Sequence, residues 1–131
     1  ALHAQGAEDE RVRAALDASV AASLDRHIGY LTRAEWHASR GDAGAARADL
    51  DAERGAAGPA SVPEVAWRAR LDAYVTALEH HEHGRRAEAI AAYRRTVELL
   101  DQERRAGRPV DTALVARAAK AHAELSTAPP R

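Results

Sequence analysis

One short segment concentrates the residue types that could bind a metal ion. Residues 79–84 read EHHEHG and hold three histidines and two glutamates. On a helix, Glu79 and His83 are four residues apart and His80 and His83 three apart, so each pair shares a face and could bind Zn²⁺. The segment contains neither H-E-x-x-H nor E-x-x-H. A solvated, titratable helix end is therefore our preferred interpretation, and a metal-handling protein is the alternative.

Other kinds of catalytic chemistry have no motif in this chain. It has no cysteine, no G-x-S-x-G, and neither of the glycine-rich patterns that bind phosphate groups. The lack of cysteine excludes disulfides, thiolate nucleophiles and Cys-based metal sites, and it leaves reducing and oxidising compartments equally open. We therefore expect a protein that is not an enzyme and that has no resident metal or cofactor.

His80 of this segment and two further histidines recur along the chain with a regular period. His37, His80 and His122 are 43 and 42 residues apart. Because an imidazole titrates between pH 5 and 8, one interpretation is a pH-sensitive ladder of histidines. The other, which we prefer, is that each ring fills space between paired helices and hydrogen-bonds one neighbour.

The composition predicts one all-helical domain at 1–131 with a thin core. The chain has 34 Ala but only eleven Leu, eight Val and two Ile. Alanine is the strongest helix former, whereas strands favour β-branched and aromatic residues. The 19 basic and 20 acidic residues nearly cancel, so the net charge gives no attraction for nucleic acid. No apolar run is long enough to span a membrane.

Helix start and stop signals divide the chain into four parts. We predict an N-terminal helix at 7–24, helical pairs at 27–55 and 61–107, and a final helix at 110–126. Residues 7–40 form either one helix or two, and we favour two, with the break at Asp25 or Gly29. The clearest start is at Ser61, which forms an S-x-x-E capping box with Glu64.

Apolar residues at helical spacing predict the buried face of each helix. The predicted stripes are Val12, Leu16, Val20 and Leu24; Ile28 and Leu31; Ala46 and Leu50; Trp67, Leu71, Tyr74, Val75 and Leu78; Ile90, Tyr93, Val97 and Leu100; and Leu114, Val115, Ala118, His122 and Leu125. The arginines between 85 and 105 interleave with acidic residues at helical spacing, which predicts a solvated face of salt bridges.

The histidine period extends to other residues. An alanine stands three residues before each histidine (Ala34, Ala77 and Ala119), Gly41 and Gly84 follow theirs by four, and Ala46 and Leu50 align with Ala89 and Tyr93. Residues 84–99, GRRAEAIAAYRRTVEL, resemble the second helix of a tetratricopeptide repeat (TPR) of the long, about 42-residue variety, and residues 40–50 are similar. The resemblance implies a stack of antiparallel helical hairpins, with about two and a half repeats after an N-terminal helix.

The same resemblance assigns roles to individual residues. It places Gly84 in the turn, Ala89 against the first helix and Tyr93 one turn later. With the register set by the glycine, Leu71, Tyr74 and Leu78 fall on positions that line the concave groove of the family. Either the groove is apolar or the register differs.

These features predict a non-enzymatic protein–protein interaction module. We expect an adaptor or accessory subunit of a larger assembly, which docks a peptide, a helix or a neighbouring subunit. Aromatic and arginine side chains most often anchor such interfaces, and the candidate contact residues are Trp36, Tyr74, Leu78, His81 and Arg85. The alternatives are a metal-handling protein that uses residues 79–83 and a self-associating structural module.

Overall fold

The computed structural model describes residues 2–22, 26–56 and 58–127, and all of their regular structure is helical. The helices are α1 (Leu2–Ala22), α2 (Arg26–Ser39), α3 (Ala43–Arg54), α4 (Val62–Glu82), α5 (Arg86–Arg105) and α6 (Thr112–Thr127). The predicted all-α class is confirmed. None of the described helices is both long enough and apolar enough to cross a membrane.

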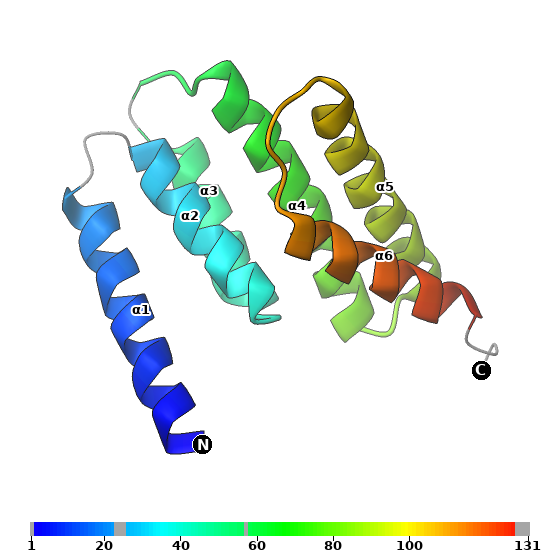
Figure 1. The fold of residues 1–131 in the computed structure, drawn as a ribbon, viewed down its shortest axis with the longest axis horizontal. Helices are drawn as coiled ribbons and strands as arrows, with labels where there is room; N and C mark the ends of the chain where they lie inside the picture. Colours follow the sequence, from blue (N-terminus) through cyan, green and yellow to red (C-terminus); the bar gives the residue numbers. More distant parts are fainter. Residues whose placement is uncertain (1, 23–25, 57, 128–131) are drawn as a thin grey trace.

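The helices pack as two antiparallel hairpins with a further helix at each end (Figure 1). In the first hairpin α2 packs against α3, and in the second α4 packs against α5. Helix α4 also contacts both α2 and α3, so it joins the two hairpins. Helix α1 packs on α2, and α6 packs on α5.

Local signals place the helix ends where the sequence predicts them. The Ser61 hydroxyl accepts a hydrogen bond from the Glu64 amide (3.2 Å), and the Glu64 carboxylate accepts one from the Ser61 amide (2.7 Å), which completes the capping box. Gly41 and Gly84, in the turns inside the two hairpins, have φ of 77° and 71°. This left-handed conformation favours glycine, so both turns need it.

The boundary between α1 and α2 differs in detail from the prediction. The two are separate helices, as favoured, and α1 begins at Leu2 rather than at residue 7. Leu24 and Asp25 lie outside the described residues. Gly29 does not break the chain, because it is buried inside α2.

The buried core follows most of the predicted stripes. Leu31, Leu50, Leu71, Val75, Tyr93 and Leu100 are almost wholly buried, and so are the small residues Ala34, Ala46, Ala77 and Ala89 at the helix crossings. One stripe differs: Ile28 is 47% exposed, and the inner face of α2 instead begins at His27. In α6 the stripe residue Ala118 is buried as predicted, but Ala119, the alanine of the 42-residue period, is exposed, so the third unit of the period departs from the other two.

Candidate functional site

A groove of about 350 Å³ opens between α1, α2 and the beginning of α6. It is lined by Val12, Leu16, Thr32, Glu35, Trp36, Ser39, Asp111, Ala113 and Arg117. The lining residues come from both ends of the chain and from its middle, so the groove exists only in the folded protein. Trp36 is the one predicted contact residue that lines it.

Polar neighbours fix the position of the half-buried Trp36 ring. His37 meets the indole edge to face, with ring centroids 5.2 Å apart. The guanidinium carbons of Arg13 and Arg40 lie 5.9 and 5.4 Å from the indole centroid, within the range of a cation–π interaction. Arg40 is in turn paired with Asp9 of α1. The indole is therefore a rigid wall of the groove, because α1 and α2 both hold it.

Beside Trp36 the groove contains a carboxylate that is poorly solvated. Burial raises the pKa of Glu35, and the negative charge of Asp111 adds to this effect. A hydrogen bond from Trp67 and the charges of Arg70 and Arg117 act in the opposite direction but do not outweigh burial. The Glu35 carboxylate would therefore gain from a hydrogen-bond donor supplied by an occupant of the groove.

Tyr74, another predicted contact residue, lies in the core. It is 5% exposed, and its ring packs edge to face against that of Tyr93, with centroids 6.1 Å apart. Burial raises the pKa of Tyr74, and burial together with the Tyr74 ring raises that of Tyr93 to about 12. Its burial makes Tyr74 a packing residue, which a partner would not reach without rearrangement.

The remaining predicted contact residues, Leu78, His81 and Arg85, lie near the turn between α4 and α5. A second, open pocket of about 270 Å³ is lined by Gly41, Leu78, His81 and Glu82. The His81 ring is hydrogen-bonded to the Tyr93 hydroxyl (3.0 Å). Arg85 is exposed and donates a hydrogen bond to Nδ1 of His80 (2.8 Å). The five predicted residues therefore occupy different places and do not form one site.

The histidines of the EHHEHG segment point to different partners. His80 accepts from Arg85, His81 contacts Tyr93, and His83 Nδ1 donates to the Glu79 carbonyl (2.7 Å). Among the residues that the structure describes, no group of three His, Asp or Glu side chains is placed to hold a metal ion. The segment behaves as a helix end, and the geometry adds no support to the metal-handling alternative.

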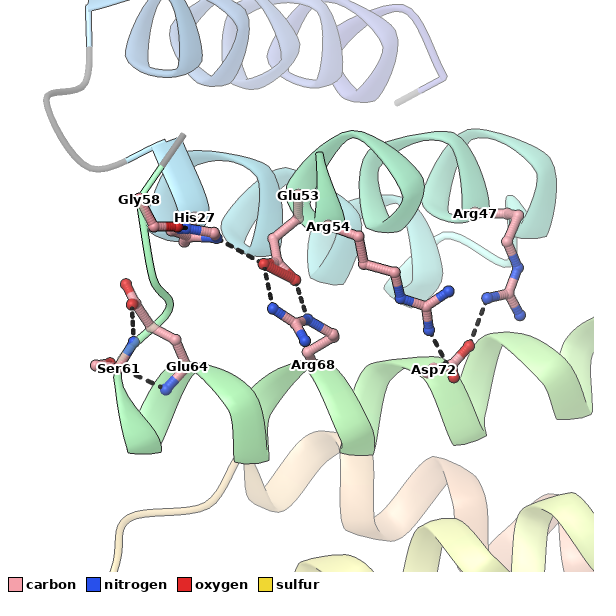
Figure 2. A network of polar contacts seen from close by, with 9 residues as sticks. All are labelled: His27, Arg47, Glu53, Arg54, Gly58, Ser61, Glu64, Arg68 and Asp72. Carbon is pink, nitrogen blue, oxygen red and sulfur yellow. Dashed lines mark hydrogen bonds and ion pairs between the residues drawn. The ribbon is translucent and has the colours of Figure 1, made fainter. Parts of the chain in front are cut away.

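A buried ionic network joins the two hairpins (Figure 2). Glu53 of α3 is wholly buried, and its Oε2 lies 2.6 Å from Nδ1 of His27 of α2. The other ring nitrogen of His27 is 2.9 Å from the carbonyl oxygen of Gly58, in the connection between α3 and α4. Arg68 of α4 donates to both carboxylate oxygens of Glu53, with Nη2 at 2.8 Å from Oε2. One carboxylate thus links three helices.

The hydrogen bonds of this network favour the charged forms of Glu53 and His27. Burial alone would raise the pKa of Glu53, but hydrogen bonds from Arg68 and His27 outweigh it and lower the pKa below its ordinary value. The hydrogen bond to Gly58 and then that to Glu53 raise the pKa of His27. The contacts therefore favour an ionised Glu53 beside Arg68 and a protonated His27.

A second set of ion pairs connects α3 to α4 nearer to the solvent. Arg47 donates to Asp72, to the Glu79 carboxylate (2.8 Å) and to the Thr76 hydroxyl (3.0 Å). Arg54 also pairs with Asp72, at 3.0 Å (Figure 2). Partly exposed ion pairs therefore flank the contact between α3 and α4.

Taken together, the groove and the network suit noncovalent recognition on a rigid frame. The sequence offered no local signal for Glu35, Asp111 and Arg117 as neighbours of Trp36, because the fold alone brings them together. Comparisons with protein-family models, curated proteins and solved structures gave no match. The resemblance to tetratricopeptide repeats therefore stays a prediction from the sequence.

Proposed function

We propose that this chain is a non-enzymatic protein–protein interaction module, which docks a peptide, a helix or a neighbouring subunit in the groove at Trp36. The observation that carries the proposal is the groove itself, which combines the apolar side chains of Val12 and Leu16 with a fixed indole. Glu35 adds a carboxylate that lacks full solvation. The groove thus combines apolar contact surface with polar groups that could orient a partner, and binding sites use both.

A stack of hairpins of tetratricopeptide type is the architecture that we propose for this module. Equivalent positions of the two hairpins support it: Ala34 and Ala77 are both fully buried. Gly41 and Gly84 share the left-handed turn conformation. In such a stack the first helix of each hairpin faces the partner, and α2 supplies Trp36 in this way.

The binding energy would come mainly from a few anchor residues. Trp36 is flanked by Arg13 and Arg40, and Trp and Arg are the residue types most enriched among interface hot spots. Because the helices that carry them are already formed, little conformational entropy is lost when a partner docks. An adaptor or accessory subunit needs this combination of a rigid surface and a few strong contacts.

A peptide library provides a direct test. Random 12-residue peptides would be selected by display on the purified chain, and the dissociation constants of the selected peptides measured by calorimetry. We expect Trp36→Ala to weaken the selected peptides by about tenfold or more, because truncating an anchor aromatic costs about 2 kcal/mol. His83→Ala, at the exposed end of α4, should leave the affinity unchanged.

The same two variants can also refute the proposal. Circular dichroism must first show that both variants keep the helical content of the parent chain. Peptides that bind the folded Trp36→Ala variant as tightly as the parent would place the binding surface elsewhere. A library that yields no binder with a dissociation constant below about 1 mM would contradict a peptide-docking role for this groove.

A further inference from the structure

Both ring nitrogens of His27 face atoms that only accept hydrogen bonds. Nε2 faces the Gly58 carbonyl oxygen, and Nδ1 faces the Glu53 carboxylate. The carboxylate already accepts hydrogen bonds from Arg68 on both oxygens and is ionised, so it has no proton to donate. Each nitrogen of His27 must therefore carry a hydrogen, which makes the ring an imidazolium.

The charged groups around His27 favour this protonated form. Glu53 faces the ring from α3, and Glu64 acts on it from α4, so two carboxylates act on it. Arg68 does not bind the ring directly: it donates its hydrogen bonds to Glu53, the carboxylate that His27 also contacts. The His27 residue is 5% exposed, so water is not available to replace a hydrogen bond that is lost.

We propose that His27 is a pH-sensitive latch, which in its protonated form fastens the connection between the two hairpins to α2. The latch has two arms. One runs from the ring to Gly58, and the other runs through Glu53 to Arg68 of α4. When both contacts are made, the first hairpin is attached at Gly58, just before the second hairpin, and at Arg68, within its first helix.

Loss of the ring proton breaks the hydrogen bond between His27 and Gly58. A neutral imidazole has a single N–H donor. The hydrogen bond to ionised Glu53 is the stronger of the two, because its acceptor is charged, so the remaining proton stays on Nδ1. Nε2 then presents a lone pair to the Gly58 carbonyl oxygen at 2.9 Å, and the contact becomes repulsive. Gly58 is three residues before the Ser61 cap, so its release loosens the entry to α4.

The direction of the pH response follows from the same groups. In the unfolded chain His27 titrates near 6.5, and the folded pKa is higher. The latch is therefore fully closed below pH 6.5 and opens as the pH rises through the folded-state pKa of His27.

Nuclear magnetic resonance on the whole chain tests this proposal without any variant. The His27 ring carbons and the Gly58 carbonyl carbon would be followed from pH 5 to pH 10, the latter by carbon detection because Pro59 has no amide hydrogen. We expect both signals to titrate with one midpoint above 6.5. A ring midpoint at or below 6.5, or a Gly58 carbonyl that does not move with the ring, would overturn the proposal.

Two variants of the network and one control variant separate the latch from ordinary titration of the protein. Glu53→Gln should lower the midpoint of the His27 ring, because it removes the nearer negative charge. His27→Gln should abolish the titration of the Gly58 carbonyl, whereas the matched change His83→Gln should preserve it. If His83→Gln abolishes it too, the carbonyl reports a general change and not the latch. If His27→Gln does not fold, the titration of the parent chain decides alone.

Discussion

Truncation of Glu53 is the strongest single test of the buried network. Glu53 is wholly buried and accepts hydrogen bonds from His27 and Arg68. Glu53→Ala leaves the buried His27 ring and the Arg68 guanidinium without their shared counter-charge. Removing one partner of a buried ion pair costs about 3–5 kcal/mol. Since domains are stable by about 5–15 kcal/mol, this single change should remove a large part of the free energy of unfolding.

The assay is urea unfolding followed by circular dichroism at pH 6 and at pH 9. At pH 6 His27 is charged in the native protein and Glu53 is ionised, so the full loss should appear. Because His27 loses its charge as the pH rises through its folded-state pKa, less charge is left unpaired at the higher pH, and Glu53→Ala should cost less there. Glu98→Ala, which breaks an exposed pair with Arg95 at 3.9 Å, is the control and should change stability by less than about 1 kcal/mol.

The result that would refute this reasoning is a small effect at both pH values. If Glu53→Ala costs less than about 1 kcal/mol at pH 6, like the surface control, then Glu53 is not the buried centre of an ionic network. A large effect that is the same at pH 6 and pH 9 would mean that the ion pair of Glu53 with Arg68 stabilises the protein and that the charge of His27 does not.

Four further substitutions test three single features, each by urea unfolding at neutral pH. Ser61→Ala removes the hydroxyl of the capping box and should cost about 1 kcal/mol; no change would mean that the cap adds no stability. Gly84→Ala forces a side chain into a left-handed turn and should cost about 1 kcal/mol, whereas Gly44→Ala inside α3 should stabilise by a similar amount; equal effects would contradict this. Tyr74→Ala empties a core position and should cost about 3–5 kcal/mol; a cost under 1 kcal/mol would place the ring at the surface.

The sequence predicts the helices well because their signals are local. The Ser61 cap and the glycine turns act over three or four residues, and a printed sequence shows them directly. Stripes such as Leu71, Tyr74 and Val75 identify the inner faces for the same reason. The groove is different, because its walls are far apart in the chain and only the packing of α6 near α2 brings them together.

The buried network did leave a trace in the sequence. His27 precedes the buried Leu31 by four residues, and Glu53 follows the buried Leu50 by three, so each ionisable residue continues an apolar stripe. Charges on an inner face are costly unless they are paired. That rule predicts partners for both residues, but it does not say that they pair with each other, since 26 residues separate them.

The network has a further consequence for how an alanine-rich stack is specified. Small side chains such as Ala34 and Ala77 allow close approach, but they bury little area, so one alignment of two hairpins is hardly better than another. Glu53 removes this ambiguity, because any shift along α4 would leave its buried carboxylate without Arg68. The more exposed ion pair between Arg47 and Asp72 would also be broken by such a shift. The alanines thus let the hairpins approach, and the charges determine where they meet.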